Sequence, residues 1–182
     1  MTDKADVADL TARLQDGSLA GKWVVAPDQT TVEFRSSSLW GLVKVKGRFT
    51  DVHGEATVDP SGTITGRLDL DVASVSTGNA KRDTHLRSTD FFDADTHNHI
   101  TFLATDVSVT GGNRLQIAGE LTIAGQSHPF AWEATVSDLD ATGVTLTSSV
   151  VIDRSQWGIA WRKMGMTKMD TGIDIKARFT RG

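Results

Sequence analysis

Most of the chain after Trp23 alternates between apolar and polar residues, the pattern of a β-strand with one buried face. About eight runs follow this pattern. They cover residues 32–38, 43–49, 63–72, 100–109, 114–123, 129–136, 144–152 and 172–179. Stretches of turn-forming residues such as DPSGT, TGGN, AGQSHP and DATG separate them. The pattern predicts an antiparallel meander of about eight strands.

One run breaks the alternation. In residues 100–109 the apolar face shifts from Ile100 and Phe102 to Leu103, Val107 and Val109. A shift of this kind predicts a β-bulge, in which one extra residue is inserted into a strand.

The number of strands favours a closed barrel, because closure removes the two unprotected edges of an open sheet. A barrel of about eight strands either fills its interior with side chains or holds one small ligand. A helix is predicted from about Asp3 to Leu14, where Val7, Leu10 and Leu14 form a narrow apolar face and Gly17 follows. We therefore expect a helical extension over residues 1–20 and one barrel domain over residues 21–182.

The composition excludes several classes of function. The 182 residues carry a net charge of −4, which argues against nucleic acid as a partner. The absence of cysteine excludes disulfides, zinc–thiolate sites and cysteine nucleophiles. No apolar run approaches the ~18 residues of a membrane helix, so stable membrane insertion is not expected. The first 21 residues lack the basic start and apolar core of a signal peptide, which predicts a cytoplasmic protein.

A polar segment, NAKRDTHLRSTDFFDADTHNHITF, interrupts the meander between Asn79 and Phe102. Residues 78–88 predict a short helix capped by Asn79, with Arg82 and Asp83 pinning it to the barrel. Phe91 and Phe92 are too large and apolar to remain in water, so the loop after the helix is expected to fold back over the barrel.

The histidines of this segment leave a second interpretation open. His97 and His99 would share one face of a strand, and His85 is near in sequence, so the three could bind zinc or copper. No thiol or evident fourth ligand accompanies them, and THNH is equally typical of a polar loop. The chain contains no G-x-S-x-G motif and no phosphate-binding loop, and we expect no enzyme activity.

A second unusual segment, DRSQWGIAWRKMGMTKMD, lies between the last two strands. It combines tryptophans and methionines with several basic residues. Methionine forms a soft, adaptable apolar surface. The segment is either a loop packed on the barrel end or a pliable rim around a cavity, with basic residues that meet a polar head group.

Residues 77–102 resemble the hallmark segment of the YceI-like family of bacterial lipid-binding proteins. The matching positions are Thr77, Asn79, Arg82, Asp83, His85, Leu86, Asp90 to Asp93, Ile100 and Phe102. Residues 23–38, 119–136 and 152–159 resemble further parts of the family, and the likeness covers about Gly21 to Arg181. The chain differs from many members in that its first residues do not have the pattern expected of a secretory signal. It also differs in having His97-Asn98-His99 before the strand and in its predicted N-terminal helix.

The resemblance implies an eight-stranded antiparallel, lipocalin-like barrel that holds a long amphiphile in an apolar tunnel. It implies a polyisoprenoid, an isoprenoid quinone or a fatty-acid derivative as ligand, with no catalysis, no metal and no cofactor besides that lipid. The residues expected to line the tunnel are Phe34, Phe49, Leu68, Leu70, Phe92, Phe102, Leu121, Phe130, Trp132, Ile152, Trp157 and Met164. The residues expected at the head group are Arg154, Arg162 and Lys163.

Two alternatives remain at this point. One is a ligand-free, stress-related interaction module whose barrel is filled by its own side chains. The other is an enzyme or a histidine-based metalloprotein on the same barrel. The expected partners are a small lipid and, because two-fold dimers are the commonest oligomers, a second copy of the chain.

Overall fold

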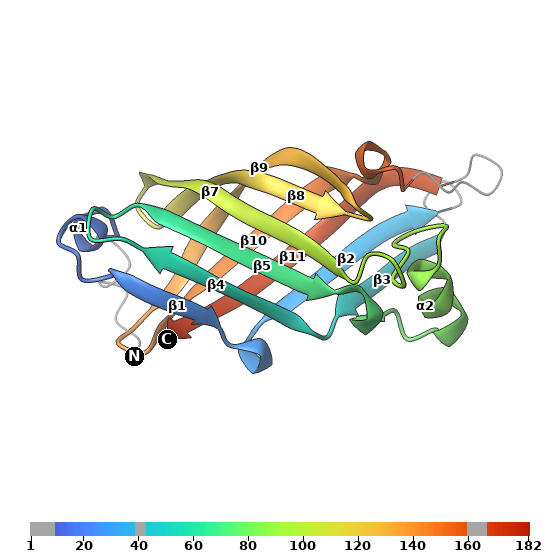
Figure 1. The fold of residues 1–182 in the computed structure, drawn as a ribbon, viewed down its shortest axis with the longest axis horizontal. Helices are drawn as coiled ribbons and strands as arrows, with labels where there is room; N and C mark the ends of the chain where they lie inside the picture. Colours follow the sequence, from blue (N-terminus) through green and yellow to red (C-terminus); the bar gives the residue numbers. More distant parts are fainter. Residues whose placement is uncertain (1–9, 39–42, 160–166) are drawn as a thin grey trace.

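The structure is a computed structural model that describes residues 10–38, 43–159 and 167–182. Its main element is one antiparallel sheet (Figure 1). The strands are β1 (Gly21–Val25), β2 (Thr31–Ser38), β3 (Val43–Phe49), β4 (Val52–Val58), β5 (Ile64–Asp71), β6 (Val75–Ser76), β7 (His99–Gly111), β8 (Arg114–Ile123), β9 (Gln126–Leu139), β10 (Gly143–Asp153) and β11 (Thr167–Arg181).

The sheet closes on itself because β1 pairs with β4 on one side and with β11 on the other. The closed ring is β1, β4, β5, β7, β8, β9, β10 and β11, which confirms the predicted eight-stranded antiparallel barrel. β2, β3 and β6 pair in that order beyond β11 and extend the wall at one end of the barrel.

Two strands of the ring, β1 and β4, were missing from the predicted set, whose runs 32–38 and 43–49 are β2 and β3 outside the ring. For β4, the small inward residues explain the omission. Gly54 faces the interior opposite Leu68, and a Cβ atom there would lie 2.6 Å from the carbonyl oxygen of Arg67. Ala56 is the next inward residue. Glycine and alanine at these positions remove the apolar alternation from which a strand is predicted.

The predicted bulge in β7 is confirmed, but its predicted position was wrong. The register with β8 shifts between Ala104 and Asp106, and Leu103 is 46% exposed. Leu103 still pairs in phase with Glu120, so its side chain lies on the outer face. The apolar face changes only after Ala104, from which point Val107 packs inward.

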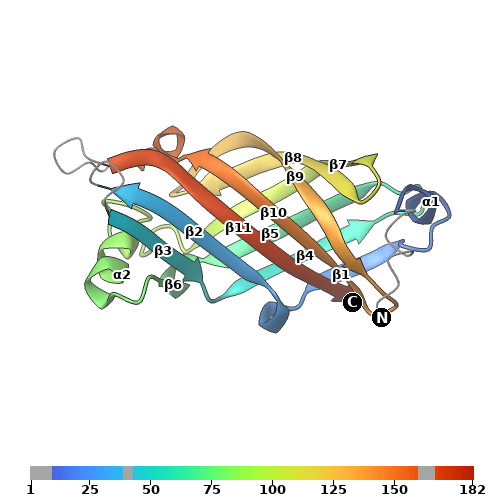
Figure 2. The same ribbon diagram turned by 180° about the vertical axis from the view of Figure 1, so that it is seen from behind.

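Two α-helices lie at opposite ends of the barrel, α1 (Leu10–Gln15) at one and α2 (Ala80–Arg87) at the other (Figures 1 and 2). Leu10 and Leu14 of α1 are buried in the barrel core, and Gly17 follows the helix with a φ of 76°. The predicted beginning of this helix, from Asp3 to Val7, lies outside the described residues. Within the described residues, no helix has the length and apolar character that crossing a membrane requires. The division into two domains stays a prediction.

Arg178 of β11 ties the last strand to the turn between β9 and β10. Its side chain is 9% exposed. One terminal nitrogen donates to Asp138 at 2.9 Å, and the other donates to Asp140 at 2.7 Å. Hydrogen bonds from the Thr142 hydroxyl and from Arg178 hold the pKa of Asp140 well below its ordinary value. The guanidinium is thus buried, whereas the two carboxylates that it meets are each almost half exposed.

We expect Asp140→Asn to flatten the acid side of the stability profile. A carboxyl whose pKa is depressed by folding stabilises the protein above its unfolded pKa, and this stabilisation is lost as the pH falls towards the folded value. Between about pH 4 and about pH 2 the wild type should therefore lose more thermal stability than the variant. Melting temperatures measured over this range test the expectation. Asp95→Asn, an exposed aspartate outside this network, is the control, and parallel curves for wild type and Asp140→Asn would contradict the prediction.

Candidate functional site

The described residues of the barrel surround a cavity towards each end. The larger, of about 320 Å³, lies at the α2 end and is called the outer chamber. The smaller, of about 140 Å³, lies at the α1 end and is called the inner chamber. Many inward aromatic and aliphatic side chains are only half-buried because they face these cavities. The interior is therefore partly open and is not filled by the barrel's own side chains.

Ten of the predicted tunnel residues form part of the outer chamber wall. They are Phe34, Phe49, Leu68, Leu70, Phe92, Phe102, Leu121, Phe130, Trp132 and Ile152. The alternation placed the nine strand residues on the inward face, and the register of the strands agrees with it, whereas Phe92 comes from the loop after α2. Met164 lies outside the described residues. That these side chains contact a ligand stays a prediction.

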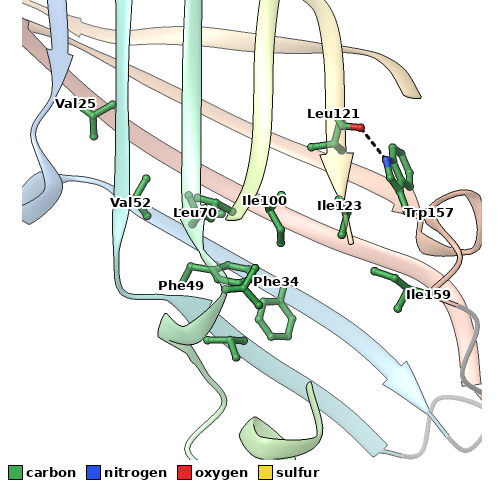
Figure 3. Close-up of a cluster of buried hydrophobic side chains, with 13 residues drawn as sticks. Val25, Phe34, Phe49, Val52, Leu70, Ile100, Leu121, Ile123, Trp157 and Ile159 are labelled. Atoms are coloured by element: carbon green, nitrogen blue, oxygen red, sulfur yellow. Dashed lines mark hydrogen bonds between the residues drawn. The ribbon is translucent and has the colours of Figure 1, made fainter. Parts of the chain in front are cut away.

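Aromatic rings form one side of the outer chamber. The Phe49 ring packs beside Phe34 at a centroid distance of 5.9 Å (Figure 3). On its other side it meets the Phe92 ring at 6.0 Å. Gly47 makes room for this arrangement, because a Cβ atom there would lie 2.3 Å from the tip of the Phe34 ring. Phe92 comes from the loop after α2, so the predicted return of this loop onto the barrel is observed.

Trp157 supports the wall from behind. It belongs to the 3-10 helix η4 (Arg154–Trp157), is 2% exposed and is not among the residues that face the chamber. Its indole N–H donates to the carbonyl oxygen of Leu121 at 2.8 Å (Figure 3). Its ring packs edge-on against Phe130 at 6.2 Å. Its observed position is that of an anchor for Leu121 and Phe130, whose side chains do reach the cavity.

The polar side chains of the outer chamber wall come from its α2 end. They are Ser36, Ser37, Arg82, His85, Arg154 and Thr171. Ser36 and Thr171 are register partners on β2 and β11. His85 and Arg154 both lie against Phe91, with a ring-centroid distance of 5.1 Å for His85 and a guanidinium-to-centroid distance of 6.0 Å for Arg154. The rest of the wall is apolar, so the chamber has one polar end.

Helix α2 brings Arg82, His85 and Leu86 to this end, although none of them was among the predicted ligand contacts. Positions 82, 85 and 86 share one helical face, and this spacing was the signal available in the sequence. As predicted, Asn79 caps the helix by accepting a hydrogen bond from the backbone N–H of Arg82.

Asp83 holds α2 in place, as the sequence predicted. Its carboxylate accepts hydrogen bonds from the backbone N–H of Thr77 at 2.9 Å and from the Thr77 hydroxyl at 2.6 Å. Arg82 does not share this role, which corrects the prediction for that residue. Its side chain lines the outer chamber and forms no ion pair with any residue that the structure describes.

The predicted head-group residues are only partly placed. Arg154 lines the outer chamber beside the α2 segment. Arg162 and Lys163 lie outside the described residues. The basic groups that the structure brings to the chamber are therefore Arg154 from η4 and Arg82 from α2.

The histidines of the segment 79–102 have different partners. His85 pairs with Asp90 at 2.7 Å, and the His97 ring occupies the space beside Gly125, where a Cβ atom would lie 2.4 Å from it. Within residues 10–38, 43–159 and 167–182, no group of three histidine or acidic side chains is arranged to hold a metal ion.

A family model described as YceI-like domain matches residues 23–180. The chain belongs to the YceI-like family. This confirms the resemblance seen in residues 77–102.

Curated relatives of this YceI-like chain are about one-third identical to it over the aligned residues. A UPF0312 protein of Vibrio cholerae is 34% identical over 106 residues, which are 57% of this chain and 56% of the relative. A UPF0312 protein of Ectopseudomonas mendocina is 36% identical over 100 residues, which are 54% of this chain and 52% of the relative. The chain spans about half the length of the curated relatives that it matches.

Solved structures share the fold. BcnA of Burkholderia cenocepacia has a TM-score of 0.76 and 23% identity, covering 85% of this chain and 98% of that chain. A polyisoprenoid binding domain from Saccharophagus degradans has a TM-score of 0.71 and 16% identity, and the match covers 88% of this chain and 98% of that domain. At these identities the likeness shows the fold of the YceI-like barrel.

We expect Asp83→Asn to loosen α2 from the barrel. The substitution weakens two hydrogen bonds to a charged group, at a local cost of about 1–2 kcal/mol. Amide hydrogen exchange should rise in residues 77–98 and stay unchanged in β8 and β9. Asp95→Asn, an exposed aspartate in the loop after α2, is the matched control. Equal exchange in the two variants would show that Asp83 does not hold the helix.

Proposed function

We propose that the protein binds and carries a long-chain amphiphile in the outer chamber, without catalysing a reaction on it. The candidates are a polyisoprenoid, an isoprenoid quinone or a fatty-acid derivative. The proposal rests on where the polar side chains of the chamber wall lie. They gather at one end, and the rest of the wall is apolar. An amphiphile has the same division between tail and head.

The tail would gain its binding energy from burial. An apolar chain that leaves water is stabilised by about 0.8 kcal/mol for each CH₂ group that it buries. Aromatic and branched side chains such as Phe34, Phe92 and Ile152 offer a continuous apolar surface for it. No specific polar contact is needed along the tail, so one chamber could accept several related chains.

The head group would lie near Arg82 and Arg154, with Ser36 and Ser37 close by. Two guanidinium groups favour an anionic or strongly polar head, because hydrogen bonds between charged groups are the strongest kind. Arg82 supports this placement most directly, since it lines the chamber and has no carboxylate partner among the described residues.

The name of one structural neighbour agrees with the proposal. The domain from Saccharophagus degradans is described as polyisoprenoid binding. Its shared fold makes a prenyl chain the first ligand to test here.

The structure offers less support to the two alternatives. A ligand-free module would be favoured by a filled barrel, whereas the outer chamber alone measures about 320 Å³. A histidine-based metal site would need His85, His97 and His99 to converge, but His85 pairs with Asp90 and His97 packs against Gly125. A cytoplasmic location and a homodimer stay predictions.

The proposal is tested by comparing a prenyl phosphate with the prenyl alcohol of the same chain length. Replacing Arg82 with glutamine should weaken binding of the phosphate by about 10-fold to 100-fold, the effect of one hydrogen bond to a charged group. Binding of the alcohol should change much less. Calorimetry or a fluorescence displacement assay can measure both.

Arg114→Gln is the matched control, because Arg114 is exposed on β8 and does not line either chamber. It should leave both affinities unchanged. Failure of the wild type to bind either lipid would refute the proposed function, whereas equal losses for phosphate and alcohol would refute only the placement of the head group.

A further inference from the structure

Four of the described side chains line both chambers and therefore lie between them. They are Leu68, Phe102, Trp132 and Ile175. Phe102 of β7 and Trp132 of β9 meet edge to face, with ring centroids 5.8 Å apart and planes inclined at 75°. This aromatic pair lies at the apolar end of the outer chamber, away from the end that carries Arg82 and Arg154.

Trp132 differs from the other two tryptophans that the structure describes. The indole N–H of Trp23 donates to the carbonyl oxygen of Leu19 at 3.0 Å, and that of Trp157 donates to Leu121 at 2.8 Å. The indole N–H of Trp132 makes no hydrogen bond within the described part of the chain. Its ring is therefore held by packing alone, and turning it aside breaks no hydrogen bond.

The inner chamber beyond the pair suits only an apolar group. Three small residues, Ala56, Gly66 and Ala104, stand side by side on β4, β5 and β7 and leave this space open. The charged groups on its wall are engaged elsewhere, Glu55 with Lys22 and Arg67 with Asp69.

The inner chamber is also small. Its volume of about 140 Å³ is close to the cavity of about 150 Å³ that accommodates benzene in another protein, so it has room for about one isoprene unit.

We propose that the Phe102–Trp132 pair is a gate that sets the preferred length of the ligand tail. This inference rests on the proposed function. A tail that ends at the pair binds without disturbing it. A tail one isoprene unit longer has to turn Trp132 aside to enter the inner chamber, and it loses the aromatic contact.

The test is the affinity of prenyl phosphates that lengthen by one isoprene unit at a time. In the wild type, affinity should rise with each unit until the tail reaches the pair, and then stop rising. In Trp132→Ala the two chambers join, so the next unit should tighten binding by at least about tenfold, because each buried CH₂ contributes about fourfold.

Phe130→Ala is the matched control, since Phe130 is an aromatic residue of β9 that lines only the outer chamber. It enlarges the site without opening the partition, so it should not extend the preferred tail beyond the pair. Adding Ala104→Leu to Trp132→Ala should refill the inner chamber and restore the wild-type preference. Phe102→Leu reaches the same partition from β7 and replaces Trp132→Ala if that variant does not fold.

The gate is supported if Trp132→Ala or Phe102→Leu prefers a longer tail than the wild type. Phe130→Ala should show no such change, and adding Ala104→Leu should reverse it. Equal shifts in Trp132→Ala and Phe130→Ala, or unchanged preference in both partition variants, would overturn it while leaving lipid binding intact. If the wild type binds none of the prenyl phosphates, the proposed function on which the gate rests is overturned instead.

Discussion

The pairing of β1 with β11 closes the sheet into a barrel. The two chambers and the difference between their ends depend on this closure. Three register pairs make the seam, Trp23 with Arg181, Val24 with Thr180 and Val25 with Phe179. The Arg181 guanidinium also lies over the Trp23 ring at 4.7 Å. A closed ring of eight strands encloses a space that large side chains can fill. Here small inward residues on β4, β5 and β7 leave part of it open.

The two ends of the barrel differ in chemistry, and this difference gives the interior a direction. At the α1 end, Leu10, Leu14 and Trp23 pack into an apolar plug. At the α2 end, Arg82 and Arg154 reach the chamber wall. A polar group is costly to bury without a partner, so an amphiphile would be oriented with its tail towards α1 and its head towards α2. Orientation follows from the wall and requires no specific contact along the tail.

Much of this arrangement could be predicted from the sequence. The alternation placed residues such as Phe34, Leu121 and Ile152 on the inward face, and the cap at Asn79 marked the beginning of α2. The prediction failed where the pattern carries no signal. β4 was missed because its inward glycine and alanine are too small to give a clear apolar alternation. Leu103 was assigned to the wrong face because hydrophobicity alone does not locate a bulge to one residue.

The sequence also did not predict which group each charged side chain contacts. Arg82 and Asp83 are neighbours, yet Asp83 binds Thr77 while Arg82 turns to the chamber. The closure of β1 on β11 and the partition by Phe102 and Trp132 join residues far apart in the chain. Periodicity within single strands does not report contacts of this kind.

The central claim is that the outer chamber holds a long-chain amphiphile. The most direct measurement is native mass spectrometry of the freshly purified protein, followed by organic extraction and identification of the released molecule. The account predicts a stoichiometric prenyl or acyl species in the extract, or its uptake when prenyl lipid is added back. A protein that carries no lipid and takes up none of these chains would contradict it.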